Sequence, residues 1–120
     1  VIEKVKIAIF DYLQANPSKK IDDVIIACFG LAFKPDIDDI RESPAMKITR
    51  ILASEHGGKV VAIEPNIQSI RGEQFELTSY ESAIEIANIC VLLVDHSEFK
   101  IGQRPISQHI VDTKGVWNYQ

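Results

Sequence analysis

Three cations stand in segments that follow buried apolar runs of the sequence. Lys34 follows a run that ends in glycine, and Lys114 directly precedes a glycine. Arg41 lies just before Ser43-Pro44, which has the residue types of a helix N-cap and a first helical position. Helix N-termini favour negative charge, and positively charged side chains beside one add to that preference. The two lysines and the helix N-terminus at Ser43 therefore predict an anion site whose ligand is a phosphate or a diphosphate.

Each of these cations also has a simpler interpretation. A Lys or Arg in a loop is most often a solvated charge, and Arg41 has Asp38, Asp39 and Glu42 as local partners. The residues alone predict an anion-binding domain and leave open whether the cations bind a ligand.

Other reactive residue types form weaker candidates for a site. The acidic residues between positions 36 and 42 lack the central glycine of a calcium loop, and no two histidines have the spacing of metal ligands. Cys28 and Cys90 lie inside apolar runs, so we expect inert core thiols. His96 follows a strand close to the predicted site, where a hydrogen bond to a nearby backbone group is favoured over ligand contact. Trp117 and Tyr119 are expected to pack or to fray.

The elements that must position these residues alternate along the chain. Continuous apolar runs predict buried strands, and apolar residues three or four positions apart predict amphipathic helices. The expected strands are 24–29, 59–63, 74–77, 90–94 and 109–111. The expected helices run from residue 2 to the stop at 16–18, from residue 44 to a closing Gly57-Gly58, and from residue 79 to 87. We expect the second helix to bury Ala45, Ile48, Ile51 and Leu52.

This alternation predicts an α/β fold, namely a three-layer α/β/α, doubly wound, Rossmann-like parallel sheet of about five strands. In such sheets ligands bind beyond the carboxyl ends of the strands. With the strand order 3-2-1-4-5, Lys34 and Lys114 leave the two strands that flank the fourth strand. The two ammonium groups would then face one cleft.

The composition excludes several classes of protein. The 120 residues are 46% hydrophobic and 25% charged, which are ordinary values for a globular domain and not for a disordered or collagen-like chain. A net charge of -4 disfavours a general nucleic-acid binder, and the apolar runs are too short to span a membrane. Two cysteines are too few for a disulfide scaffold, so a reducing cytoplasmic compartment is expected. Because the chain starts at Val1 inside a helical pattern, we expect it to be part of a longer protein.

Several motifs together resemble one known family. Residues 30–44 read GLAFKPDIDDIRESP, followed in order by Glu64-Pro65-Asn66, by DHSEF at 95–99 and by DTKGVW at 112–117. Over about residues 22–118 the chain resembles the C-terminal UDP-binding domain of the UDP-glucose/GDP-mannose dehydrogenase family. Within that family it looks most like the bacterial UDP-N-acetyl-D-mannosamine 6-dehydrogenases.

The resemblance implies an NAD-dependent oxidoreductase that oxidises C6 of a UDP-sugar to a carboxylate through a thiohemiacetal on a cysteine. The product, UDP-N-acetylmannosaminuronate, would serve surface polysaccharide synthesis. Residues 22–120 would form the C-terminal UDP-sugar-binding domain, and residues 1–21 the end of a helix from an absent central dimerisation domain. The whole enzyme is expected to be a cytoplasmic homodimer or larger assembly, with neither nucleic acid nor membrane as a partner.

Matching positions carry the family's binding roles to this chain. Phe33, Lys34 and Lys114 would contact the UDP-sugar, and Arg41 would reach NAD bound mainly by the absent N-terminal domain. The chain has no Gly-x-Gly-x-x-Gly fingerprint after a strand and no motif of the family's nucleophilic cysteine. We therefore expect no catalytic residue and no metal ligand in this chain, and no activity from it alone.

Two other functions remain open at this point. The first alternative is the C-terminal domain of a UDP-glucose 6-dehydrogenase, which differs only in the sugar. The second is a nucleotide-binding module without catalysis.

Overall fold

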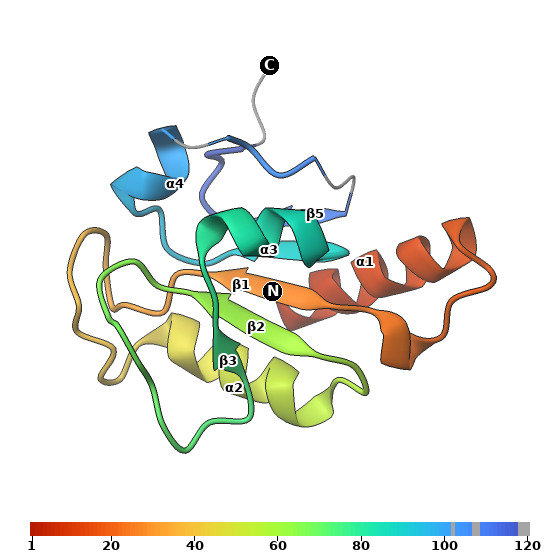
Figure 1. Ribbon diagram of the computed structural model, residues 1–120, viewed down its shortest axis with the longest axis horizontal. Coiled ribbons are helices and arrows are strands. Elements are labelled where there is room, and N and C mark those ends of the chain that lie inside the picture. The colour runs from red at the N-terminus through yellow and green to blue at the C-terminus, as the bar shows by residue number, and fades with distance from the viewer. Residues whose placement is uncertain (102, 107–108, 118–120) are drawn as a thin grey trace.

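Five parallel strands form a single sheet in the computed structural model, which describes residues 1–101, 103–106 and 109–117 (Figure 1). The strands are β1 (Ile26–Phe29), β2 (Val60–Ile63), β3 (Glu76–Leu77), β4 (Ile89–Leu92) and β5 (Ile110–Asp112). They lie in the order β3-β2-β1-β4-β5, and every neighbouring pair is parallel. This order confirms the predicted doubly wound sheet and places β4 between β1 and β5.

Helices cover both faces of the sheet (Figure 1). The helical elements are α1 (Ile2–Ala15), the 3-10 turn η1 (Ile21–Asp23), α2 (Pro44–Glu55), α3 (Tyr80–Ile86) and α4 (Ser97–Ile101). Helices α1 and α2 pack on one face, and α3 and α4 pack on the other. The three-layer prediction is therefore confirmed. None of the described helices has both the length and the apolar character needed to cross a membrane.

Alternating side chains of the strands fill two separate cores. Cys28 packs with the α1–α2 layer, whereas its neighbour Phe29 packs with the α3–α4 layer, as the pleat of a strand requires. The Phe29 ring makes edge contacts with Phe99 at 5.6 Å and with Trp117 at 4.9 Å between ring centroids. Trp117 is 1% exposed and its Nε1–H donates to the Phe99 carbonyl. The packing role predicted for Trp117 is confirmed, while Tyr119 lies outside the described residues.

Both cysteines are buried in these cores. Burial raises the pKa of the Cys28 thiol, and likewise that of Cys90, to about 12. A thiol with so high a pKa carries almost no thiolate at neutral pH, which is the nucleophilic form. The structure thus confirms them as inert core thiols.

Helix α2 buries a stripe that differs from the predicted one. Ile51 was placed on the buried face by its spacing, but it is 41% exposed. Thr49 takes a core position instead, because its hydroxyl donates to the Ala45 carbonyl at 2.8 Å and is satisfied inside the helix. The buried residues are Ala45, Met46, Thr49 and Leu52, with Ile48 partly buried. The cap prediction is confirmed, since Ser43 Oγ accepts the Met46 N–H.

Long-range hydrogen bonds shift the ends of two strands. β1 begins two residues later than predicted, because the Ile25 N–H donates to Asn88 Oδ1 instead of joining the ladder. β4 ends at Leu92 because the next two N–H groups, of Leu93 and Val94, both donate to the Phe29 carbonyl. These partners are distant in sequence, so local patterns do not indicate them.

The pair Gly57-Gly58 does not close α2 with a left-handed cap. The helix ends at Glu55, and its C-cap residue His56 is extended, with φ −80° and ψ 135°. Position 58 requires glycine because there is no room for a side chain. A Cβ there would lie 2.4 Å from the Val24 carbonyl oxygen and 2.8 Å from His56 Nε2. The close approach of the α2–β2 turn to the start of β1 therefore demands the glycine.

Gly58→Ala is expected to lower the free energy of unfolding by about 1–3 kcal/mol, because the added methyl group forces a backbone carbonyl to move. Gly57→Ala is the matched control. Its Cβ meets the flexible end of Asp22 at 2.9 Å, so a change below about 0.5 kcal/mol is expected. Urea unfolding of both variants checks the prediction, and equal stabilities would contradict it.

Candidate functional site

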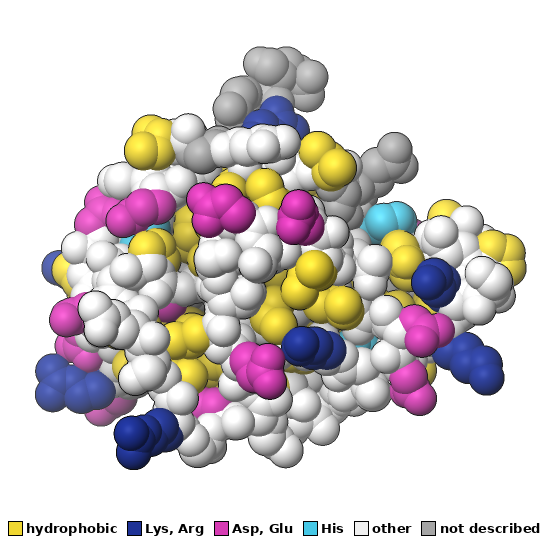
Figure 2. Space-filling view, in the orientation of Figure 1, with side chains coloured by type: hydrophobic (Ala, Val, Ile, Leu, Met, Phe, Trp, Pro, Cys, Tyr) yellow, Lys and Arg dark blue, Asp and Glu magenta, His cyan; other side chains and the backbone are white. Residues whose placement is uncertain are grey.

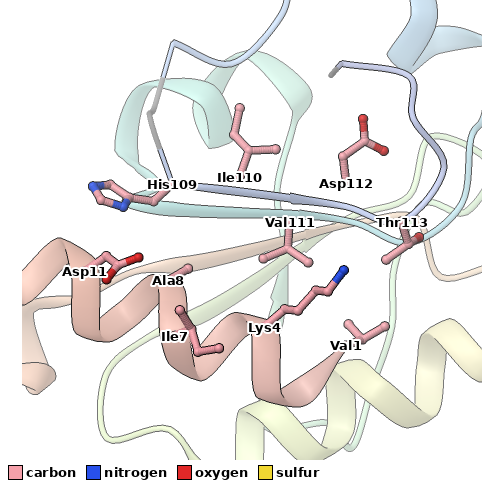
Figure 3. A pocket seen from close by; sticks show the side chains of 10 residues that line it. All are labelled: Val1, Lys4, Ile7, Ala8, Asp11, His109, Ile110, Val111, Asp112 and Thr113. Atoms are coloured by element: carbon pink, nitrogen blue, oxygen red, sulfur yellow. The ribbon is translucent and has the colours of Figure 1, made fainter. Parts of the chain in front are cut away.

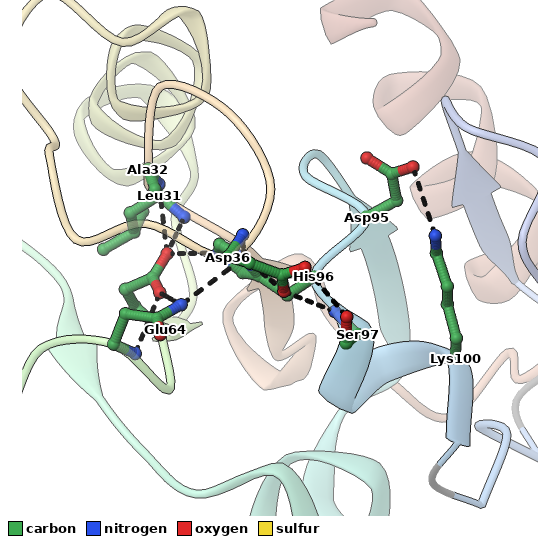
Figure 4. A network of polar contacts seen from close by, with 9 residues as sticks. Leu31, Ala32, Asp36, Glu64, Asp95, His96, Ser97 and Lys100 are labelled. Atoms are coloured by element: carbon green, nitrogen blue, oxygen red, sulfur yellow. Dashed lines mark hydrogen bonds and ion pairs between the residues drawn. The ribbon is translucent and has the colours of Figure 1, made fainter.

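A buried carboxylate holds the loop that follows β1, residues 30–43, which we call the β1 loop. Glu64 is the first residue after β2, and its side chain is completely buried. Its Oε1 accepts the N–H of Leu31 at 2.8 Å and that of Ala32 at 3.0 Å (Figure 4). Its Oε2 accepts the N–H and the side-chain amide of Asn66, both at 3.1 Å. The start of the β1 loop is thus fixed to the end of β2.

His96, just beyond β4, completes this arrangement from the other side. Its ring is completely buried, and its Nδ1 accepts the Asp36 N–H at 2.8 Å. Because Nδ1 accepts, the ring proton is on Nε2, which donates to Glu64 Oε1 at 2.9 Å. The prediction that His96 bonds a nearby backbone group is confirmed, and its partner is the middle of the β1 loop.

Opposing effects set the ionisation of Glu64. Burial alone raises the pKa of Glu64, but the hydrogen bonds from His96 and from the Leu31 and Asn66 N–H groups outweigh it. The net pKa lies below the ordinary value for glutamate. A carboxylate that accepts several N–H bonds remains ionised even when it is buried. Glu64 is therefore an internal anion within the fold.

Asp36 ties the same loop to helix α4. It adopts a left-handed backbone conformation with φ +63°, and its carboxylate accepts both the N–H and the hydroxyl of Ser97 at 2.8 Å. These Ser97 hydrogen bonds lower the pKa of Asp36. The carboxylate supplies an N-cap from a distant loop to α4, a helix of five residues that the sequence patterns did not indicate.

The β1 loop also begins in tight contact with the end of β4. Gly30 has φ +101°, and a Cβ at this position would lie 2.6 Å from the Cβ of Val94. Only glycine combines this backbone conformation with this close approach. The loop therefore leaves the sheet directly over the end of the neighbouring strand.

The segment after β5 forms a compact turn that carries the second lysine. The Asp112 carboxylate accepts the N–H groups of Lys114, Gly115 and Trp117 at 2.9, 2.8 and 2.6 Å. The hydroxyl of Thr113 donates to the Leu92 carbonyl of β4 at 2.8 Å. The backbone at Lys114 is thus held while its side chain points to solvent.

The structure places the predicted binding residues on the surface at the carboxyl ends of the strands. Phe33 is 56% exposed, and Lys34 and Lys114 are also exposed. Among the described residues, neither ammonium group has a hydrogen-bond or ion-pair partner. Lys34 follows β1 and Lys114 follows β5, on either side of β4, as the strand order predicts.

Arg41 has a local partner at the end of the β1 loop. Its guanidinium makes two hydrogen bonds to the Asp39 carboxylate, at 3.0 and 3.1 Å, and the pair is solvent exposed. An exposed ion pair contributes little to stability, so Arg41 is available to exchange Asp39 for another anion. The Asp36 and Asp39 carboxylates are both engaged, with Ser97 and Arg41 respectively.

Two cavities lie near this edge without including the predicted residues. The larger, of about 560 Å³, lies between α1 and β5 and includes Lys4, His109 and Thr113 in its lining (Figure 3). The second, of about 380 Å³, lies where β2 ends and includes Glu64, Tyr80 and Glu98. Neither cavity is lined by Lys34 or Lys114. A further, open hollow of about 410 Å³ in the β1 loop is lined by Asp38, Asp39, Ile40 and Arg41, so it includes the predicted Arg41 but neither lysine.

Acidic residues lie on both the α3–α4 face and the carboxyl edge, and the edge differs in its exposed lysines, Lys34 and Lys114. Acidic side chains gather over α3 and α4 in Figure 2, where the exposed residues include Glu81, Glu85 and Glu98. A phosphate-bearing ligand is repelled from such a face. Lys34 beyond β1 and Lys114 beyond β5 offer the opposite charge, and neither has a partner in the part of the chain that the structure describes.

The turn after β1 does not have free backbone amides for a dinucleotide. In a dinucleotide-binding fold, N–H groups of this turn and of the following helix face the pyrophosphate. Here the Leu31 and Ala32 N–H groups donate to Glu64, which occupies that position with a carboxylate of the protein itself. The turn therefore does not fit NAD as its main binding site.

Sequence reasoning missed the central role of Glu64. The available signal was a glutamate directly after a strand that is apolar throughout, because a charge at the end of a buried strand needs partners there. The identity of those partners depends on which loops the sheet brings together, and sequence spacing does not give it.

The fold and the site define a doubly wound α/β domain that presents an anchored loop and two lysines at its carboxyl edge. The sequence model described as "UDP-glucose/GDP-mannose dehydrogenase family, UDP binding domain" matches residues 27–119. The chain belongs to this family.

Individual relatives agree with this assignment. The UDP-N-acetyl-D-mannosamine dehydrogenase of Escherichia coli (strain K12) is 45% identical over 98% of this chain. The NDP-N-acetyl-D-galactosaminuronic acid dehydrogenase of Ralstonia solanacearum is 41% identical over 84% of it. A solved UDP-N-acetyl-mannosamine dehydrogenase from S. aureus is 30% identical, with a TM-score of 0.66, and the match covers 97% of this chain and 28% of that one. The chain spans 29% of the length of the E. coli relative and 25% of the Ralstonia one.

Glu64→Gln is expected to lower the free energy of unfolding at neutral pH by about 3 kcal/mol, because a neutral amide is a weaker acceptor for the buried donors. The variant should also lose less stability in acid. Since folding lowers the pKa of Glu64, its carboxylate stabilises the fold above the unfolded-state pKa, near 4.3. That contribution disappears as the pH falls through the lower folded-state pKa. Urea unfolding from about pH 7 to about pH 3 checks this, and parallel curves for the two proteins would contradict it.

Proposed function

We propose that this chain is the UDP-sugar-binding domain of an NAD-dependent UDP-N-acetyl-D-mannosamine 6-dehydrogenase. The whole enzyme would oxidise C6 of the sugar to a carboxylate and yield UDP-N-acetylmannosaminuronate for surface polysaccharide synthesis. The observation that carries the proposal is the anchored β1 loop, which exposes Phe33 and Lys34 at the edge where such sheets bind ligands. The identity to relatives named for this activity supports the choice of sugar.

In this proposal two lysines bind the diphosphate of the UDP-sugar. An ammonium is a compact point charge that suits a phosphate oxygen. Lys34 and Lys114 approach from either side of β4 on backbone segments that hydrogen bonds hold in place. Phe33 adds an exposed apolar ring beside Lys34, which offers contact to the flat faces of the base or sugar.

NAD would be bound mainly by a preceding domain, because Glu64 already occupies the amides of the β1 turn in this chain. When bound, NAD accepts the hydride removed from C6. Arg41 would reach its pyrophosphate from the entry to α2 by releasing Asp39. The nucleophilic cysteine would also come from outside this chain, since Cys28 and Cys90 are buried with raised pKa values.

The domain arrangement follows the same proposal. Residues 22–120 would form the C-terminal domain, and residues 1–21 would continue a helix from a central dimerisation domain. Val5 and Ile9 of α1 are buried in the main core, so this helix is firmly attached to the sheet. The whole enzyme would act in the cytoplasm as a homodimer or a larger assembly.

Lys34→Ala in the full-length protein is expected to weaken UDP binding by about 1.5–3 kcal/mol, because a charge-assisted contact to a phosphate oxygen is lost. Folding should change little, since the side chain is exposed and has no partner among the described residues. Lys19→Ala is the matched control, since this exposed lysine precedes β1 and lies at the opposite end of the strand. Calorimetric titration with UDP measures both, and equal affinities for Lys34→Ala and wild type would overturn the assignment.

Substitutions at Arg41 and at Lys114 are expected to weaken the binding of different ligands. Arg41→Lys should weaken NAD more than the UDP-sugar, because lysine cannot reproduce the planar fork that a guanidinium offers to pyrophosphate oxygens. Lys114→Ala should weaken the UDP-sugar more than NAD. Titration of both ligands against both full-length variants measures these affinities. If both variants lose affinity for the same ligand by the same factor, the assignment of Arg41 to NAD and Lys114 to the UDP-sugar is wrong.

A further inference from the structure

We propose that His96 is a positioning residue for UDP-sugar binding, acting through Asp36 to set the conformation of the β1 loop at Phe33 and Lys34. The inference rests on the proposed function of this loop. His96 is completely buried, so the ring itself does not touch a ligand at the surface. Its effect must pass through the backbone that it holds.

The two binding residues lie between two anchor points of the β1 loop. On one side, Glu64 binds the N–H groups of Leu31 and Ala32, and on the other His96 binds the N–H of Asp36. Within this span the Phe33 N–H donates to the Asp39 carbonyl at 2.7 Å, which folds the loop back on itself. A short span anchored at both ends leaves the exposed side chains few alternative backbone positions.

His96 is itself held by the protein in one orientation and one tautomer. Glu64 accepts from Nε2, so Nδ1 is free of a proton and faces the Asp36 N–H (Figure 4). Edge contact with Phe99 at 5.5 Å between ring centroids fixes the plane of the imidazole. These hydrogen bonds connect the segments that follow β1, β2 and β4 through one ring, and the anchored Asp36 lies two positions after Lys34.

Asp36 adds a second connection to the same point. Its φ of +63° is uncommon for a residue with a side chain, and its hydrogen bonds to Ser97 and His96 compensate for that conformation. The anchored residue lies two positions after Lys34. Release of the His96 contact would therefore allow the loop to leave this conformation and carry the Lys34 ammonium with it.

Two substitutions in the full-length enzyme test the contacts of the two His96 ring nitrogens one at a time. Asparagine places an acceptor near the position of Nδ1, so His96→Asn retains the Asp36 contact and loses Glu64. Glutamine places a donor near the position of Nε2, so His96→Gln retains Glu64 and loses Asp36. We expect His96→Gln to raise the KM for the UDP-sugar about tenfold, with kcat and the KM for NAD within about twofold of wild type. His96→Asn should keep the KM for the UDP-sugar within about twofold.

A second histidine provides the control for general destabilisation. His56 contacts the Val24 carbonyl through Nε2 at 2.7 Å, at the opposite end of the strands. His56→Asn loses this contact across 32 residues of sequence, because an asparagine amide reaches only the position of Nδ1, and the change lies far from the β1 loop. Its KM for the UDP-sugar should equal that of wild type. An equal rise in KM for His56→Asn and His96→Gln would show loss of fold and overturn the positioning role.

Lys34→Ala, measured beside these variants, distinguishes the two proposals. If Lys34→Ala weakens UDP binding and His96→Gln does not, the positioning role is wrong and the proposed function stands. If wild type and Lys34→Ala bind UDP equally, the proposed function of the loop fails, and the positioning role fails with it.

Asp36→Gly keeps the proposal testable should His96→Gln fail to fold. Glycine accepts the positive φ and keeps the backbone N–H, so this exposed substitution removes only the carboxylate, which bonds Ser97 and lies 3.9 Å from His96 Nδ1. Asp38→Gly is its control in the same loop, because the Asp38 side chain is exposed and has no partner among the described residues. We expect Asp36→Gly to raise the KM for the UDP-sugar about three- to tenfold over Asp38→Gly. Equal KM values would show that the Asp36 carboxylate does not help to hold the loop, and would overturn its part in the proposal.

Discussion

A carboxylate buried without a neighbouring ammonium or guanidinium must be satisfied by hydrogen bonds, because an unpartnered charge in the interior is very costly. Glu64 meets this requirement with N–H donors from the β1 loop, from its own segment and from His96. The carboxylate holds the donors in place by accepting their hydrogen bonds, and these hydrogen bonds keep the carboxylate charged. The geometry of the whole carboxyl edge depends on this mutual constraint.

The parallel sheet makes that constraint possible. With the order β3-β2-β1-β4-β5, the segments leaving β2, β1 and β4 emerge side by side, although they are about 30 residues apart in sequence. On the α3–α4 face, the packing of Phe29 with Phe99 and Trp117 fixes the segments that follow β4 and β5. One core thus positions the segments that follow β4 and β5. Glu64 and His96 connect the segments that follow β1, β2 and β4.

The same carboxylate limits what the β1 turn offers to a ligand. The Leu31 and Ala32 N–H groups face an internal anion and are not free for a pyrophosphate, so in the proposed function side chains such as Lys34 and Lys114 would bind the anionic ligand. Lysines on anchored backbone offer charge with little loss of backbone entropy on binding. The proposed UDP-sugar-binding domain would therefore need a separate domain for NAD.

The fold class, the caps at Ser43 and Ser79 and the loops at the carboxyl ends of the strands could all be predicted from the sequence, because hydrophobic period and capping chemistry are local. The same patterns marked Lys34 and Lys114 as cations beyond strand ends. The role of Glu64, the partner of His96, the start of α4 and the exposure of Ile51 could not be predicted in this way. Each of these depends on a contact between segments distant in the chain, and the energy of a buried polar group is set by the partners that such contacts bring to it.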